Sequence, residues 1–295
     1  MHPYFRLNAP RSSWSVLRTV VTAFALWLSE AEFLVGAERA EREKSSTPRP
    51  LIQAHSHNDY EHARPLFDAL DLGFCNVEAD IYLVDGQLLV AHDRKDVRPD
   101  RTLERLYLEP LRERFRQNRG RIYPEGTPFT LLVDIKEHAD LVYPVLDRVL
   151  RRYRSMLTSF TSHQTRTGAV TVVLSGDRPF RLVEQQKRRW CGLDGRLADL
   201  ASNPSPHLVP WVSDTWLAHF AWRGEGEIPA ADWQKLKGVV AQAHSQGRRL
   251  RFWATGNDPK GWKVLQDAGV DLLGADDLTA LHQFLTRPSE RTLEP

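Results

Sequence analysis

The stretch from Ala54 to Asp93 reads AHSHNDYEHARPLFDALDLGFCNVEADIYLVDGQLLVAHD and decides how this 295-residue chain folds. Its centre, Val77 to Leu83, has the apolar run of a β-strand. Side chains alternate between the two faces of a strand, so Glu78 and Asp80 point the same way. Two neighbouring carboxylates on a buried face repel each other, and a hard cation between them removes that conflict. The stretch therefore predicts a strand that carries a metal site.

Histidines stand on both sides of this carboxylate pair. His57 follows the apolar run 51–54, and His92 follows the run 87–91. An imidazole titrates near neutral pH and can act as a general acid or base. An acid and a base beside a cation indicate metal-assisted phosphodiester chemistry. His55 is either an alternative catalytic histidine or a hydrogen-bond partner that orients His57.

Apolar runs alternate with helical patterns from Leu51 onward, which predicts parallel strands joined by helices. The expected strands are 51–54, 74–83, 87–91, 130–135, 169–174, 207–212, 250–255 and 270–273. No glycine-rich nucleotide-binding loop follows any of them. This pattern over about 245 residues favours an α/β fold of the (β/α)8 TIM-barrel type over a doubly wound sheet. The segment Trp190 to Pro206 is the weak part of the pattern, where DGR and NPSP obscure any fifth strand of the barrel.

Catalytic groups of a TIM barrel gather where the strands end, at the C-terminal face. Polar residues do follow the expected strands: Asp134 and Lys136 close the run LLVDIK, and Trp253 lies in RFWATGN. Trp253 is expected either to pack in the core or to line an apolar wall for glycerol or for a choline-like head group bound by cation–π contact. Asp276 and Asp277 are expected to cap the final helix.

Taken together, these motifs resemble one known superfamily. HSHNDY, RPLFDAL, VEADIYL, LLVAHD, LLVDIK and GVDLLGADDL are similar to the phospholipase C-like phosphodiesterases, which unite glycerophosphodiester phosphodiesterases with phosphatidylinositol-type phospholipases C. The likeness is nearest to the altered-inheritance-of-mitochondria type branch and spans most of the chain after Leu51. It implies a TIM barrel and phosphoric diester hydrolase activity.

The resemblance also implies a metal site. Glu78 and Asp80 match the metal-binding Glu-x-Asp of the superfamily, and Asp134 matches its third carboxylate. Asn58 resembles the metal-ligating asparagine of phospholipases C. Ligands that are all oxygen atoms favour one Ca²⁺ or Mg²⁺ ion over zinc.

The same resemblance assigns the acid, the base and the phosphate contact. His57 and His92 match the two catalytic histidines, with His57 as base and His92 as acid, or the reverse. Lys136 would help to neutralise the phosphate. The usual His-Arg-Gly and Pro-Glu-Asn motifs of glycerophosphodiester enzymes are missing, so Arg64, Lys136 or Arg251 would replace the missing arginine.

Three alternatives stay open at this point. His55-x-His57 also suits zinc amidohydrolases or polymerase-and-histidinol-phosphatase-like hydrolases, although these need further histidines at later strand ends. A secreted barrel could have lost catalysis and serve as a binding module. Glu78 and Asp80 could instead form structural ion pairs with Lys136 and arginines in the barrel mouth.

Composition limits the partners. A formal charge of +2 with 41% hydrophobic residues is typical of a globular protein and argues against a dedicated nucleic-acid binder. We expect a monomer that acts on a small phosphodiester or phospholipid substrate, with any membrane contact at the periphery. Cys75 and Cys191 could pair in an oxidising compartment, but a buried free thiol is favoured for Cys75.

The N-terminus is typical of an export signal. Arginines precede an apolar stretch, Thr19 to Leu28, and small residues suit cleavage after about Ala37. The expected organisation is a signal peptide at 1–37, or an uncleaved anchor, then a linker at 38–49 and the barrel at 50–290. The sequence thus predicts a periplasmic or secreted protein.

Overall fold

Eight parallel strands pair in the order β10-β9-β8-β7-β4-β2-β1-β11. The computed structural model describes residues 48–287. The barrel strands are β1 (Leu51–Ser56), β2 (Phe74–Val84), β4 (Phe129–Ile135), β7 (Val170–Gly176), β8 (Gly192–Gly195), β9 (Trp211–Thr215), β10 (Arg249–Trp253) and β11 (Leu273–Ala275). A parallel bridge between Arg251 and Leu272 joins the two ends of this order, so the barrel is nearly closed. The predicted TIM-barrel fold is confirmed.

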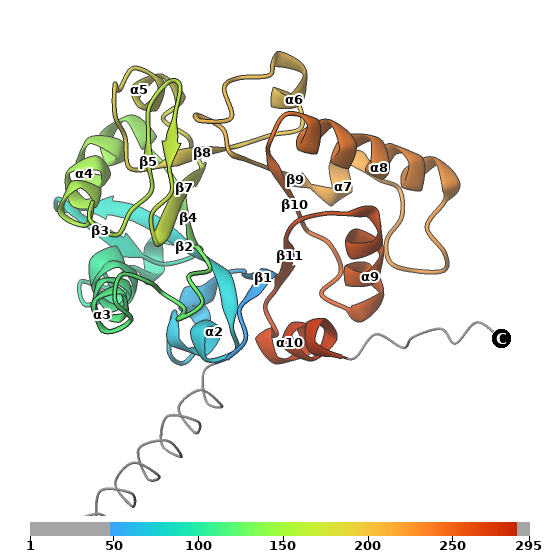
Figure 1. Ribbon diagram of the computed structural model, residues 1–295, viewed down its shortest axis with the longest axis horizontal. Helices are drawn as coiled ribbons and strands as arrows, with labels where there is room; N and C mark the ends of the chain where they lie inside the picture. The colour runs from blue at the N-terminus through green and yellow to red at the C-terminus, as the bar shows by residue number, and fades with distance from the viewer. Residues whose placement is uncertain (1–47, 288–295) are drawn as a thin grey trace, which may run out of the picture. The chain divides into compact units, whose positions relative to one another are not determined.

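Helices surround the strands (Figure 1). They are α2 (Phe67–Asp71), α3 (Glu109–Gln117), α4 (Ala139–Arg152), α5 (Phe180–Glu184), α6 (Asp199–Ser202), α7 (Trp216–His219), α8 (Ala230–Ser245), α9 (Pro259–Ala268) and α10 (Leu278–Thr286). Shorter turns are η1 (Asp59–Glu61), η2 (Arg94–Asp96) and the π-helical η3 (Glu104–Leu108). α4 buries Val142, Leu146 and Val149, whose spacing of three and four residues forms one face.

One predicted strand lies off the barrel path. β3 (Gln87–Val90) pairs with β2 in the antiparallel direction, with Val90 opposite Ile81. The chain turns back through Asp85 and Gly86, which have φ of 48° and 77° and suit a tight hairpin. The count of eight predicted strands was therefore right only because β3 stood in for a strand that the pattern did not show.

The strand that the pattern did not show is β8, which lies in the obscured segment. Its sequence, GLDG, has no apolar alternation because backbone space decides its composition. A Cβ atom on Gly192 would lie 2.6 Å from Pro210, and one on Gly195 would lie 2.8 Å from Val209. The small hairpin of β5 (Ser159–Phe160) and β6 (Thr165–Arg166) was also not predicted.

The side chains inside the barrel change character along its axis. The main core lies between strands and helices, whereas a thin apolar layer crosses the interior. This layer consists of Leu132, Val173, Trp211 and Leu272. Toward the C-terminal ends of the strands, polar and charged side chains follow the layer: His55, Glu78, Asp80, Asp134, Ser175, Asp194, Ser213 and Arg251. The interior of the barrel is thus polar at the C-terminal ends of the strands, where a functional site of a TIM barrel is expected.

The predicted signal peptide at 1–37 and most of the predicted linker lie outside the described residues. Within residues 48–287, no helix is long and apolar enough to cross a membrane. Cys75 and Cys191 are both buried free thiols, as favoured for Cys75.

Two glycines with positive φ, Gly86 and Gly176, allow the energetic cost of backbone strain to be compared with the added cost of steric overlap. We expect Gly86→Ala to lower the free energy of unfolding by about 1 kcal/mol, because its φ is 77° and an added Cβ meets nothing within 4 Å. Gly176→Ala should lower it by roughly 2–4 kcal/mol, because its φ is 71° and the Cβ would also overlap Ile135 O and lie 2.5 Å from Asp134 Oδ1. Urea unfolding of both variants checks this, and equal losses would contradict it.

Candidate active site

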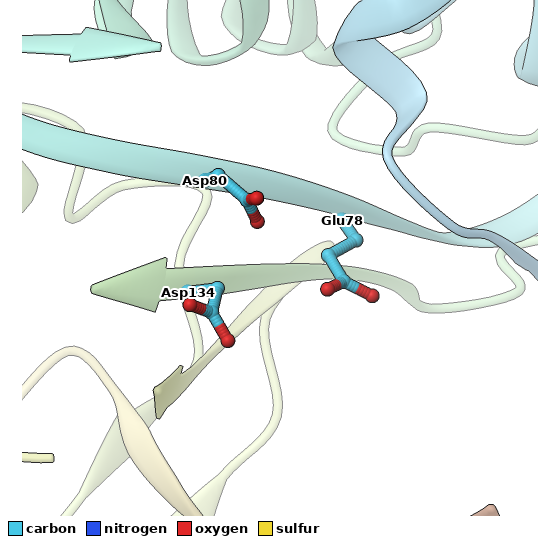
Figure 2. A group of neighbouring side chains, drawn as sticks. All are labelled: Glu78, Asp80 and Asp134. Carbon is cyan, nitrogen blue, oxygen red and sulfur yellow. The ribbon is translucent and has the colours of Figure 1, made fainter. Parts of the chain in front are cut away.

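Three carboxylates from two neighbouring strands share one space at the C-terminal end of the barrel (Figure 2). Glu78 and Asp80 come from β2 and Asp134 from β4, and their ligand oxygens lie within 4.8 Å of one another. The parallel register pairs Asp80 directly with Asp134, which points both side chains the same way. The structure therefore brings together the three carboxylates that the sequence predicts as metal ligands.

Two cations partly compensate this charge. Arg251 Nη2 lies 2.9 Å from Glu78 Oε2, at the closing strand β10. Lys136 Nζ lies 2.6 Å from Asp80 Oδ2 and 3.3 Å from Asp134 Oδ1. The ion pairs weighed as a structural alternative thus exist. Two positive charges against three carboxylates still leave the cluster negative by one unit.

The carboxylates respond differently to this environment. Burial raises the pKa of Asp134 to about 6, Lys136 opposes the shift, and the charges of Asp80 and Glu78 add to it. Burial also raises the pKa of Asp80. Burial would do the same to Glu78, but Arg251 and His55 hold the pKa of Glu78 below its usual range. Asp80 and Asp134 are therefore the undercompensated members of the cluster.

His55 is fully buried beside the carboxylate cluster. Its Nε2 lies 2.9 Å from Glu78 Oε2, and the ring packs edge-on against Trp211 with centroids 5.9 Å apart. Burial lowers the pKa of His55 to about 3, and Arg251 adds to the shift. The ring is therefore neutral and donates its Nε2–H to Glu78. It orients this carboxylate rather than His57.

His57 lies in the mouth of the barrel, at the C-terminal ends of the strands, and its side chain is 37% exposed. Its Nδ1 is 2.7 Å from Asp276 Oδ1, and Asn257 Nδ2 donates to Asp276 Oδ2 at 2.6 Å. The expectation that Asp276 caps the last helix is wrong, because this carboxylate pairs with His57. Asp277 is the cap, and it accepts the Ala280 N–H at 2.9 Å. A ring held at Nδ1 presents its Nε2 on the opposite side.

A phenol links the remaining predicted groups. Tyr60 Oη lies 2.7 Å from Asp80 Oδ2, 2.9 Å from Asn58 Oδ1 and 3.2 Å from His92 Nδ1. Burial raises the pKa of Tyr60, and Asp80 adds to this, so the phenol keeps its proton. His92 itself is exposed, at the end of β3. Tyr60 was not predicted as a site residue, although its spacing in the HNDY turn is the signal that could have indicated it.

The model of the AIM6-like phosphodiesterase domain matches residues 46–191. The altered inheritance of mitochondria protein 6 of Eremothecium gossypii is 31% identical over 271 residues, which cover 79% of this chain and 69% of that protein. The chain belongs to this family. A homologue from Arthroderma benhamiae is 27% identical and covers 78% of this chain and 82% of the relative.

Two solved structures are also similar to this member of the altered inheritance of mitochondria protein 6 family. A glycerophosphodiester phosphodiesterase from Parabacteroides distasonis has a TM-score of 0.46 and 14% identity, covering 80% of this chain and 98% of that chain. An Oleispira antarctica phosphodiesterase in complex with the product sn-glycerol-3-phosphate has a TM-score of 0.47 and 15% identity, covering 78% and 96%. The family model that matches residues 46–191 describes a phosphodiesterase domain.

Of the predicted substrate contacts, Trp253 lies on a strand that contributes to the site, whereas Arg64 does not contact the carboxylate cluster. Trp253 lies two residues beyond Arg251 on β10, with 41% of its surface exposed. Arg64 is not brought to the cluster. Its guanidinium pairs with Asp68 and Asp71, which precede the N-terminal end of β2. These local carboxylates hold Arg64 on the outer surface, so Arg251 and Lys136 are the cations of the site.

Another buried carboxylate of the polar layer, that of Asp194, was not predicted because it lies on the unpredicted strand β8. Asp194 Oδ2 accepts hydrogen bonds from the hydroxyls of Ser175 and Ser213, and it lies 2.9 Å from Arg196 Nη1. This network continues the polar layer from β7 to β9. No periodic pattern in the sequence indicates it.

Asp134→Asn should stabilise the protein when divalent cations are removed with EDTA. The pKa of Asp134 is about 6 when folded and near 3.8 when unfolded, so its ionised form weakens folding above pH 6. We expect the free energy of unfolding at pH 8 to rise by up to about 3 kcal/mol and the gain to vanish near pH 4. Chemical unfolding at both pH values checks this. Asp96→Asn, at an exposed position, is the matched control, and an equal gain there would refute the charge-burial explanation.

Proposed function

We propose that this chain is a divalent-cation-dependent phosphodiesterase that acts on a glycerophosphodiester or a phospholipid-derived head group. One observation carries the proposal. Glu78, Asp80 and Asp134 form a buried cluster with an excess negative charge, and two accessible imidazoles flank it. A cluster of this kind is unfavourable for stability alone, and such clusters are concentrated at functional sites.

The residues fit a hard cation. Asp80 Oδ1 is buried and has no hydrogen-bond partner among residues 48–287, so one ligand oxygen is left for an ion. Asp134, Glu78 and the Asn58 amide, which Tyr60 links to Asp80, would complete an all-oxygen set. Such ligands favour Ca²⁺ or Mg²⁺. The bound ion would stabilise the charge that develops on the phosphoryl oxygens.

The side chains of the mouth supply the proton transfers. His57 would take the proton of the attacking hydroxyl at Nε2, and the Asp276 carboxylate on Nδ1 would stabilise the resulting imidazolium. His92 would give a proton to the leaving alkoxide, and these two roles could be exchanged. Lys136 would stabilise the phosphate from the side of Asp80 and Asp134. The attacker is water or a neighbouring hydroxyl of the substrate, which would give a cyclic phosphate.

The zinc alternative is less well supported by this geometry. His55 hydrogen-bonds to Glu78 and His57 to Asp276. Within the described part of the chain, the one group of three candidate metal ligands consists of carboxylates alone. A zinc hydrolase of the predicted alternative class would need histidines converging on one ion.

The cellular setting is proposed from the N-terminal sequence and composition. The arginines and apolar run of residues 1–37 support export to the periplasm or outside the cell. We propose a monomer that meets lipid substrates at the membrane periphery. Cell fractionation and light scattering test these two statements.

Cation dependence is the first test of the activity. The chain should hydrolyse bis(p-nitrophenyl) phosphate or glycerophosphocholine, lose this activity in EDTA and regain it with Ca²⁺ or Mg²⁺. Glu78→Gln should abolish cation binding in calorimetry while circular dichroism shows an intact fold. Glu184→Gln, at an exposed position, should leave both unchanged. Rescue by Zn²⁺ alone would favour the amidohydrolase-like class, and inactivity with every metal would favour a binding module.

The histidine roles can be separated with two leaving groups. His57→Ala and His92→Ala should each lower kcat on glycerophosphocholine by about 10²–10⁴-fold. p-Nitrophenolate leaves without a proton, so loss of the general acid should matter little with bis(p-nitrophenyl) phosphate. We therefore expect His92→Ala to be largely spared on the second substrate and His57→Ala to be impaired on both. The reverse pattern would exchange the two roles. Exposed His163→Ala is the control, and full activity of both variants would sink the assignment.

A further inference from the structure

The barrel has a hollow at the N-terminal ends of its strands. It has a volume of about 530 Å³, within the range of small-molecule pockets. Its walls include Ile52, Val173, Pro210, Trp211, Arg249 and Val270. Trp211 belongs to the apolar layer that crosses the interior, and the carboxylate cluster lies on the other side of this layer. The hollow is therefore separate from the phosphodiesterase site.

A guanidinium without a close carboxylate lies in this hollow. Arg249 Nη1 donates to Asn76 Oδ1 at 3.1 Å and Nη2 to Ile52 O at 2.9 Å, and both acceptors are uncharged. No carboxylate among residues 48–287 lies within 4.0 Å of its nitrogens. The guanidinium also stacks 5.6 Å from the centroid of the Trp211 ring. These two hydrogen bonds leave N–H groups of Arg249 for an external anion.

One acid, Asp271, does line the hollow, but it is already engaged. Its Oδ2 accepts the Leu250 N–H at 2.8 Å and lies 2.9 Å from His244 Nε2. Burial lowers the pKa of Arg249, and Asp271 opposes the shift. The arginine is thus partly buried and has incomplete charge compensation. An anion would supply the missing partner.

The other walls favour an apolar group. Ile52 is 60% exposed, which is unusual for an isoleucine on a barrel strand. Val173, Val270 and Pro210 extend the same apolar lining. The buried Nε1–H of Trp211 has no acceptor among the described residues. A ligand that satisfies these walls needs an oxyanion at one end and an apolar body.

We propose that this hollow binds a carboxylate with a medium-length apolar chain. The carboxylate lies against the Arg249 guanidinium, whose planar fork suits two parallel hydrogen bonds to carboxylate oxygens. The chain lies along Ile52, Pro210 and Val270. This site is independent of the proposed function, because its residues take no part in holding the cation or moving protons.

Calorimetry with octanoate tests the proposal on the full chain. Octanoate should bind with one-to-one stoichiometry. Acetate has the charge without the chain and octanol the chain without the charge, so each should bind at least tenfold more weakly. Failure of octanoate to bind would overturn the proposal. Octanol binding as tightly as octanoate would overturn the role of the charge.

Two variants locate the binding. Arg249→Gln should weaken octanoate at least tenfold, and Ile52→Trp should block it by filling the hollow. Leu141→Trp makes the same kind of change at another exposed position, so octanoate binding should persist there. Unchanged binding in Ile52→Trp overturns the location, even if Arg249→Gln does not fold. Diester turnover by both variants should stay within about twofold of the parent, because the apolar layer separates the two sites.

Discussion

The crowding of three carboxylates at one end of the barrel is the constraint on which the rest of the structure depends. Parallel pairing of β2 with β4 fixes Asp80 beside Asp134, and alternation along β2 adds Glu78 to the same face. The repulsion requires cations from other parts of the chain. Arg251, 173 residues beyond Glu78, supplies one of them from β10. Closing the barrel therefore brings the positive charge of Arg251 next to Glu78, so the fold and the charge balance of the site depend on each other.

The apolar layer around Trp211 divides this interior into two environments. On one side, His55 connects Trp211 with Glu78. On the other, Arg249 stacks on the same indole ring. The indole, with a neutral imidazole on one side and a guanidinium on the other, separates the two polar regions, because water cannot fill the space that the ring occupies. Each region therefore keeps its own charge balance. It is negative around the carboxylates, whereas in the hollow Asp271 opposes the charge of Arg249 without forming an ion pair with it.

The site could be predicted from the sequence wherever the local pattern of residues determines the geometry. Strand alternation placed Glu78 and Asp80 together, and the end of a strand placed Asp134 near them. The structure could not be predicted where tertiary packing decides which residues a strand contains. In β8, two glycines are required by the close approach of Pro210 and Val209. The partners Asp276 and Arg251 lie about 170 to 220 residues from the groups they bind, and no local pattern reports such contacts. For Arg64 the local sequence was misleading. Its position suggested a contact with the substrate, but its guanidinium pairs with the nearby carboxylates of Asp68 and Asp71 instead.

The arrangement also explains why an ion and a folded barrel would stabilise each other. Without a cation, the raised pKa values of Asp80 and Asp134 mean that their ionised forms oppose folding at neutral pH. Ligand that binds only the folded state stabilises it by mass action, and here it would also remove an existing repulsion. Tyr60 extends this coupling to the mouth, because the phenol that contacts Asp80 also contacts Asn58 and His92. Neutralising the carboxylates would therefore change the position of His92 as well as the stability of the fold. The same buried charges that oppose folding would then also position a group that transfers protons.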